Sequence, residues 1–223
     1  MESQWNDDSF RIIDPVTDSN CYGFLRNEKC LIIDPNDYSQ LKPLLQKRNI
    51  RSPLVLLTHE HCDHISALNA LRKDFDPLVV ASCACGEGMK SMKENMSRMM
   101  EMFLYYKSGE TRFVPYEPFI CQPADVLFSE EIRLPFGDSQ VWMKSLPGHT
   151  HGSSIISWNG MLFVGDYLLP GEKVLTRLPG GSDEEYEACA RPWLQNIPDG
   201  TWICPGHGER FQMSAEVRQF HDL

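Results

Sequence analysis

Four side chains that can bind metal ions occur within six residues of the chain. They are His59, His61, Asp63 and His64, inside residues 58–64. Neutral imidazole is the commonest metal ligand in proteins, and carboxylate oxygen binds the same borderline cations. Side chains two residues apart on an extended loop can converge on one ion, whereas Asp63 and His64, one turn further on, can face a second. We predict a metal site here; the alternative is a polar loop with Asp63 as a helix N-cap.

Three further candidate ligands follow predicted strands, and each lies beside a glycine, which lets the backbone approach a crowded ion. They are His149, Asp166 and His207. Taken singly, His149 could be a loop histidine with other partners and Asp166 a turn former. Together with the first loop they supply five histidines and two aspartates, enough for two divalent ions with one carboxylate between them. Ligand type favours zinc, and iron or manganese suit the same mixture.

Composition restricts the partners and the compartment. The net charge of -10 disfavours nucleic acid and anionic membrane surfaces, because both require basic patches. No apolar run reaches membrane-spanning length, and the acidic start lacks the features of a signal peptide. The eight cysteines lie mostly in apolar runs, and their spacing matches no four-cysteine zinc site. We therefore expect a reduced, cytoplasmic protein.

The first half of the chain alternates strands and helices around the first metal loop. The predicted strands are residues 10–14, 20–25, 30–34, 53–57 and 78–81. Apolar residues at helical spacing predict helices at 41–48 and 65–75, so the metal loop joins a buried strand to a helix. This alternation predicts an α/β (α+β) fold with helices packed on a sheet.

The second half predicts mainly strands, and a helix near the end. The predicted strands are residues 126–128, 131–134, 141–146, 155–158, 161–164 and 201–204. Asn159-Gly160 predicts a tight hairpin between two of them. An N-cap and an acidic first turn at residues 182–185 predict a helix to about Gln195. Because no repeat or obvious linker interrupts the chain, we predict one domain spanning residues 1–223.

A methionine-rich insertion at about residues 86–120 separates the two halves. Its apolar residues recur at spacings of three and four and predict one helical face: Met89, Met92, Met96, Met99, Met100, Phe103 and Leu104. Residues 111–123, rich in proline and aromatic side chains, predict a loop that folds back over the domain. The stripe could be an ordinary buried face, an adaptable wall of a substrate pocket, or the interface of a homodimer.

The ligand pattern resembles that of the metallo-β-lactamase-fold hydrolases, over nearly the whole chain. The matching residues, in order and type, are His59-x-His61-x-Asp63-His64, His149, Asp166 and His207. The resemblance implies a four-layer αβ/βα sandwich with the metals at one edge, between two sheets. It implies three ligand groups: His59, His61 and His149 for the first metal, Asp63, His64 and His207 for the second, and Asp166 as the bridge.

Four short segments look like the glyoxalase II branch of that family, which hydrolyses S-acylglutathione thioesters. They are residues 19–22, 147–150, 178–181 and 205–208. Only sixteen residues follow His207, so the C-terminal domain that holds glutathione in larger members has no counterpart. The family's penicillin-cleaving members commonly have a cysteine or no ligand where Asp166 stands, which disfavours lactamase activity. Its sulfur dioxygenases use one iron and fewer ligands.

The expected activity is metal-dependent hydrolysis of a small-molecule thioester or similar small ester. Two cations about 3.5–4 Å apart can share a water, lower its pKa from about 15.7 towards 7, and polarise the substrate carbonyl. The resemblance implies catalytic roles for the bridging Asp166 and for Asp63, which could relay a proton to the leaving group. His151 has no ligand role in the family pattern and is structural or supports the site. Alternatives are a lactonase, a phosphodiesterase or a non-catalytic metal-binding regulator.

Overall fold

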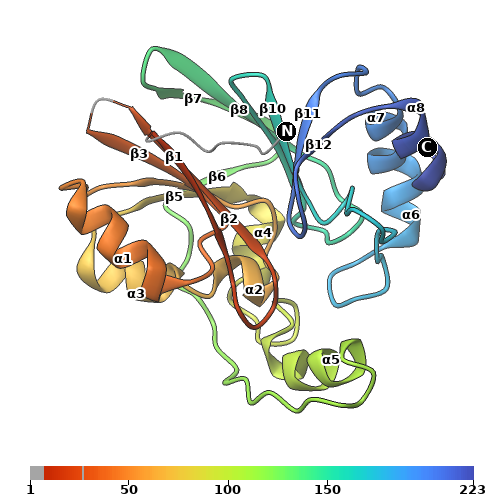
Figure 1. The fold of residues 1–223 in the computed structure, drawn as a ribbon, viewed down its shortest axis with the longest axis horizontal. Coiled ribbons are helices and arrows are strands. Elements are labelled where there is room, and N and C mark those ends of the chain that lie inside the picture. The colour runs from red at the N-terminus through yellow and green to blue at the C-terminus, as the bar shows by residue number, and fades with distance from the viewer. Residues whose placement is uncertain (1–7, 27) are drawn as a thin grey trace.

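Two six-stranded β-sheets face each other in the computed structural model, which describes residues 8–26 and 28–223 (Figure 1). The acidic start of the chain, on which the expectation of no signal peptide rests, lies almost wholly outside the described residues. Within the described ranges, no helix is long and apolar enough to cross a membrane.

The first sheet contains the strands of the N-terminal half. Its order is β1 (Ser9–Ile13), β2 (Asn20–Arg26), β3 (Lys29–Ile33), β4 (Leu54–Leu56), β5 (Leu78–Ser82) and β6 (Val126–Phe128). Strands β1 to β3 are antiparallel, and β3 to β6 are parallel. The predicted hairpin of β2 and β3 is confirmed, with Leu25 paired to Cys30.

The second sheet contains the strands of the C-terminal half. Its order is β12 (Phe211–Gln212), β11 (Trp202–Pro205), β10 (Met161–Gly165), β9 (Ser154–Trp158), β8 (Ser139–Ser145) and β7 (Glu131–Phe136). All neighbours are antiparallel except β10 and β11. The predicted Asn159-Gly160 turn joins β9 to β10, and both residues have positive φ, as this hairpin turn requires. The two-residue β12 was not predicted.

Helices cover the outer face of each sheet and complete four layers. On the first sheet they are α1 (Tyr38–Lys47), α3 (Leu68–Asp74) and α4 (Cys83–Gly88). On the second sheet they are α6 (Asp183–Glu185), the π-helical η2 (Tyr186–Ala190), α7 (Arg191–Gln195) and α8 (Ala215–Phe220). The predicted αβ/βα sandwich is therefore confirmed.

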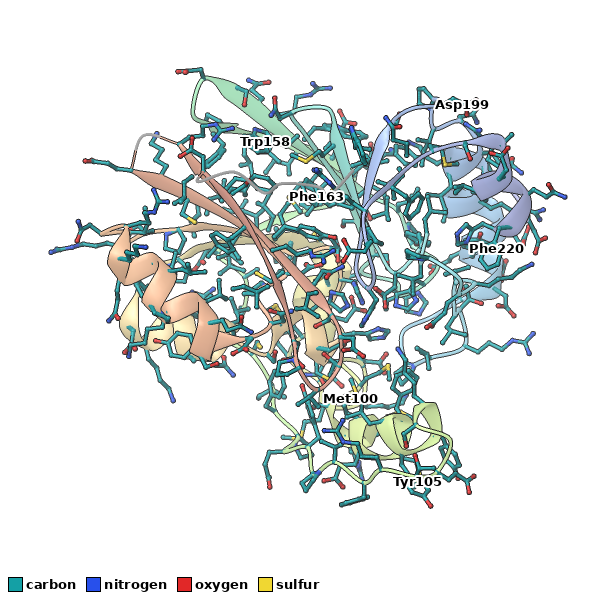
Figure 2. The ribbon with its side chains drawn as sticks, in the orientation of Figure 1. Met100, Tyr105, Trp158, Phe163, Asp199 and Phe220 are labelled. Carbon is teal, nitrogen blue, oxygen red and sulfur yellow. The ribbon has the colours of Figure 1, made fainter. Side chains whose placement is uncertain are left out.

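Alternation of side chains along the strands produces the layers. On β3, Leu31 and Ile33 face the second sheet, whereas Cys30 and Ile32 face the helices, as the strand period of two requires. All four are buried, so β3 reads as a continuous apolar run. Phe163 of β10 lies in the core between the sheets, as Figure 2 shows.

The helix predicted after the first metal loop is divided in two. A short α2 (Cys62–Ile65) precedes α3, and Ser66 and Ala67 separate them. Asp63 lies inside α2 rather than at its N-cap, which is His61 and makes no capping bond through its side chain. The alternative interpretation of this loop as a simple helix cap is therefore wrong.

The methionine-rich segment is not one continuous helix, so that prediction was wrong. It contains the 3-10 turn η1 (Ser97–Met99) and α5 (Met100–Lys107). Met96, with φ of 63°, adopts the left-handed conformation just before η1, and the Asn95 side chain accepts a bond from Ser97 N, which favours a turn over a helix. Residues 111–123 form the predicted loop.

The inter-sheet core provides a stability test. Phe163 is 1% exposed and packs edge-on against Tyr22 and Phe24, so Phe163→Ala should lower the free energy of unfolding by about 3–5 kcal/mol. The matched control is Phe113→Ala, because Phe113 is 65% exposed and should change stability by less than about 0.5 kcal/mol. Urea unfolding followed by tryptophan fluorescence measures both; equal losses would contradict this core assignment.

Candidate metal centre

The structure brings all seven predicted ligands to one end of the two sheets. The first four follow β4, and the others follow β8, β10 and β11, in the order His149, Asp166 and His207. Because β10 and β11 are parallel, Asp166 and His207 leave adjacent strands at the same edge. Two sheets facing each other thus present their loops to a common space.

Three histidines form the first group of converging side chains. His59, His61 and His149 are each at most 2% exposed and place ring nitrogens within 4.8 Å of one another. His149 Nε2 lies 3.1 Å from His61 Nδ1. This group can offer three nitrogen atoms to one ion.

The second group combines two histidines with a carboxylate. Asp63, His64 and His207 also place ligand atoms within 4.8 Å of one another. Asp63 Oδ2 lies 3.3 Å from His207 Nε2 and 3.6 Å from His64 Nε2.

Asp166 lies between the two groups. One of its oxygens, Oδ2, is 3.8 Å from His149 Nε2 of the first group and 3.5 Å from His207 Nε2 of the second. Its other oxygen, Oδ1, is 3.4 Å from His64 Nε2. A single carboxylate is thus within reach of both groups.

Outward hydrogen bonds fix which nitrogen of each ring faces the centre. His61 Nε2–H donates to Pro179 O at 3.1 Å, and His149 Nδ1–H donates to Leu175 O at 2.7 Å. A carbonyl can only accept, so in the neutral rings His61 Nδ1 and His149 Nε2 are left as acceptors directed inward. Such partners orient metal-binding histidines and raise their basicity.

Asp34 orients the ring of His64 in the same way, through a hydrogen bond on its outer side. This role was not predicted from the sequence. Asp34 Oδ2 accepts from His64 Nδ1–H at 3.2 Å, while Thr58 donates to both oxygens, through N at 2.7 Å and Oγ1 at 2.6 Å. Asp34 could join His59 and His64 as a third ligand group. Its oxygens are already engaged, so we interpret it as the carboxylate that orients His64.

A sequence signal for Asp34 exists. Asp34 is an acidic residue at the end of the predicted apolar strand 30–34. In the structure it directly follows β3 and has φ of 53°, a strained conformation for a residue other than glycine. Only the parallel pairing of β3 with β4 brings it beside Thr58, and that pairing is not readable from local sequence.

Close backbone approach explains one glycine beside a ligand. A Cβ on Gly206 would lie 2.0 Å from Asp166 Oδ1 and 2.8 Å from His64 Cε1. Any larger residue there would displace the carboxylate between the two groups.

The residues fit bound cations. His61 Nδ1 and His149 Nε2 are two acceptor atoms 3.1 Å apart, an arrangement that is repulsive without a positive charge beside them. Within the described part of the chain, buried His59 Nε2, His64 Nε2 and Asp166 Oδ1 also lack a hydrogen-bond partner. Buried polar atoms are rarely left unpaired, and unpaired atoms converging on one space match the donor set of a metal site.

The pKa values of the histidines shift in opposite directions in the two ligand groups. Burial, helped by the neighbouring His149, lowers the pKa of His61 to about 3, and burial also lowers the pKa of His59 and His149, so the first group is uncharged at neutral pH. Burial also lowers the pKa of His207, but Asp166 and Asp63 outweigh it and raise that pKa to about 9. Burial raises the pKa of Asp166, yet His207 and His64 hold it well below the usual range. At neutral pH the second group therefore holds ionised carboxylates beside a protonated His207, and a bound cation would replace that proton.

Hydrogen bonds from strand β2 of the first sheet hold the loop that contains His207. Asn20 Nδ2 donates to Pro205 O at 3.0 Å and Gly208 O at 2.8 Å, and Asn20 N donates to Gly206 O at 2.7 Å. Tyr22 Oη donates to Pro205 O at 2.8 Å. These bonds tie the two sheets together beside the predicted ligand.

A pocket opens directly above the ligands. Three parts of the chain line this pocket: the ligands themselves, α5 with Met96, and the loop after β10. Its lining includes His61, Asp63, His149, Asp166, His207, Met96, Met100, Phe103, Leu104, Lys107, Leu169, Glu172, Leu175 and Leu178. The site is thus open to a small molecule with an apolar part.

Two other predicted features lie outside the centre. His151 is exposed and its Nδ1 lies 2.6 Å from Glu185 Oε2, so it belongs to a surface pair rather than to the ligands. All eight cysteines are free thiols, with Cys83 and Cys189 exposed and the others buried.

Fold and ligand set together define a metal-dependent hydrolase with a buried His/Asp centre. The sequence matches the Metallo-beta-lactamase superfamily over residues 14–207, and the chain belongs to that superfamily. The family resemblance read from the sequence is confirmed.

Two relatives agree with this class. The chain is 26% identical over 204 residues to the probable metallo-hydrolase YqgX of Bacillus subtilis, covering 90% of each chain. It is 28% identical over 196 residues to hydroxyacylglutathione hydrolase of Hamiltonella defensa, covering 86% of this chain and 64% of that one.

Two solved structures share the fold. The B3 metallo-β-lactamase BLEG-1 superposes with a TM-score of 0.75 at 26% identity, covering 96% of this chain and 97% of that one. TTHA1623 in a di-iron-bound form superposes with a TM-score of 0.69 at 27% identity, covering 94% and 97%.

The centre predicts the metal content. Freshly purified protein should contain close to two equivalents of zinc, iron or manganese, because two ligand groups share one carboxylate. Elemental mass spectrometry measures the stoichiometry, with a chelator-treated sample as the baseline. One equivalent in saturating metal would contradict two ions.

The Asp34 contact predicts an indirect loss of affinity. Asp34→Asn weakens the partner of His64 and should reduce metal affinity by about 10–100-fold. Competition with a chromogenic chelator measures the affinity. His151→Gln, at an exposed histidine that pairs with Glu185, is the matched control and should retain wild-type affinity; equal affinity of all three proteins would exclude an orienting role for Asp34.

Proposed function

We propose that the protein is a dinuclear metal-dependent hydrolase that cleaves a thioester or a similar small ester. The observation that carries this proposal is the position of Asp166, within 3.8 Å of a histidine from each ligand group. A carboxylate there can fix the spacing of two ions, which a single-metal or non-catalytic site would not require.

We assign the ligands by the two groups of the site. The first ion would be held by His59, His61 and His149, the second by Asp63, His64 and His207, with Asp166 shared. When bound, the ions would supply an activated water and polarise the substrate carbonyl. Zinc is the proposed metal because of the imidazole and carboxylate donors; the di-iron form of TTHA1623 supports iron as the alternative, and manganese suits the same donors.

Asp63 is the proposed proton carrier. Burial raises its pKa, but His64 and His207 outweigh that effect and lower the pKa to about 2, so the carboxylate is ionised at neutral pH. It lines the pocket, so its carboxylate would be placed to relay a proton to the departing group. In a thioester this reaction breaks the carbon–sulfur bond, forms a carbon–oxygen bond and releases a thiol and a carboxylic acid.

The thioester assignment is supported by the similarity to hydroxyacylglutathione hydrolase. Glutathione itself is not part of the proposal, because the chain covers only 64% of that relative. The similarity to BLEG-1 makes a β-lactam a second candidate substrate, although Asp166 argues against it.

The protein is proposed to act on a small molecule in the cytoplasm, and its eight free thiols support this compartment.

A homodimer through residues 86–120 stays a proposal. It is supported by Met99, Met102 and Tyr106, which are 42%, 56% and 60% exposed on the outside of this segment. Analytical ultracentrifugation of wild type and Met102→Glu tests this interface.

A substrate panel tests the function. Metal-loaded protein should hydrolyse acyl thioesters faster than lactones, bis-p-nitrophenyl phosphate or a β-lactam. Asp166→Ala should lose more than about 100-fold in kcat/KM and at least one metal, since the shared ligand is gone, while the far-UV circular dichroism stays native. Turnover of Asp166→Ala within about tenfold of wild type, a cost of only ~1.4 kcal/mol, would show that Asp166 does not bridge. His151→Gln is again the matched control.

A further inference from the structure

One face of α5 lines the pocket above the predicted ligands and ends in a lysine. Met100, Phe103, Leu104 and Lys107 follow the spacing i, i+3, i+4 and i+7, which places them along one side of a helix. All four line the pocket. The neighbouring positions Met99 and Met102 are 42% and 56% exposed and lie outside it.

The helix has an inner and an outer end relative to the ligands. Met100 packs with Met96 on Cys62 of the metal loop, so it marks the inner end. Figure 2 shows Met100 beside the body of the molecule and Tyr105 further out along the helix. At about 1.5 Å per residue, the Lys107 backbone lies about 10 Å beyond that of Met100.

The inner end is firmly attached to the metal loop. Asn95 O accepts from Cys62 N at 2.7 Å, and Asn95 Nδ2 donates to Phe119 O at 2.8 Å. Ser97 Oγ also donates to Phe119 O, at 3.0 Å. Asn95 and Ser97 are at most 1% exposed, so this part of the wall is a packed structure with a defined distance to the ligands.

Lys107 places a cation in an otherwise apolar wall. Among the described residues it makes no ion pair, and it is an exposed residue that lines the pocket. Glu172, in the loop after β10, also lines the pocket and carries the reverse charge. A lysine in a last helical turn also stabilises the helix dipole, as Lys47 does in α1, but it could do so from any face.

We propose that the substrate is an amphiphilic thioester or ester with an apolar chain and a terminal carboxylate. The acyl chain would lie along Met100, Phe103 and Leu104, and the carboxylate would meet Lys107, whose backbone lies about 10 Å further along the helix than that of Met100. A single lysine suits a carboxylate monoanion better than a phosphate, which commonly takes several cationic donors. This inference rests on the proposed hydrolase function, because it places the carbonyl at the metal ligands.

A matched substrate pair tests the charge. We expect metal-loaded protein to hydrolyse the mono-N-acetylcysteamine thioester of octanedioic acid about fivefold faster, in kcat/KM, than that of octanoic acid. Lys107→Gln should abolish this preference and Lys107→Arg should retain it. The control Lys47→Gln, at an equivalent position of a helix remote from the pocket, should leave the preference unchanged. A preference absent in wild type, or surviving in Lys107→Gln, would overturn the proposal.

A second pair tests the apolar wall. Met100→Ala should raise KM for both thioesters by about tenfold with little change in metal content, because it removes apolar contact area from the pocket. Met99→Ala is the matched control, since Met99 is the preceding residue but lies outside the pocket. Equal kinetics of Met100→Ala and wild type would remove the chain-binding role from α5.

Binding without turnover separates this inference from the proposed function. Octanedioate and octanoate are titrated calorimetrically into metal-loaded wild type and Lys107→Gln. Tighter binding of octanedioate that depends on Lys107, without hydrolysis of any thioester, would uphold the pocket assignment and reject the thioester function. Hydrolysis without any Lys107-dependent difference would uphold the function and reject the pocket assignment.

Discussion

Electrostatic repulsion among buried acceptor atoms is the constraint on which the rest of this structure depends. His61 Nδ1 and His149 Nε2, which are acceptor atoms in the neutral rings, lie 3.1 Å apart in the buried centre. Burying such groups costs free energy unless positive charge compensates for it. The fold supplies rigid surroundings, and bound cations would supply the compensation, so we expect metal binding to stabilise the folded chain.

That rigidity comes from layers that hold each ligand from outside. Parallel pairing of β3 with β4 brings Asp34 to Thr58 and His64, and the pairing of β10 with β11 places Asp166 next to the loop of His207. Asn20 ties the His207 loop to the first sheet. The sandwich therefore serves the centre by fixing loop ends from both sheets, and the central apolar core sets the distance between them.

Local patterns in the sequence predicted most of the features that depend on residues close together in the chain. Strands, the Asn159-Gly160 hairpin and ligand types at strand ends follow from side-chain period, turn chemistry and donor preference. Asp34 was missed because its role exists only after two strands pair. The continuous helix predicted through Met96 was wrong because spacing alone cannot reveal the Asn95 turn that interrupts it. A tertiary contact decided the first case, and a local side-chain bond that the apolar spacing does not encode decided the second.

The interruption at Met96 has a structural consequence. A continuous helix would direct its apolar residues to one side along its full length, whereas the turn at Asn95 lets Met89 pack in the first core and Met96 and Met100 pack on the metal loop. The backbone hydrogen bond from Cys62 N to Asn95 O then fixes the pocket wall relative to the loop that carries the predicted ligands. Residues that shape the pocket and residues that bind metal thus belong to one packed unit, although they lie far apart in sequence.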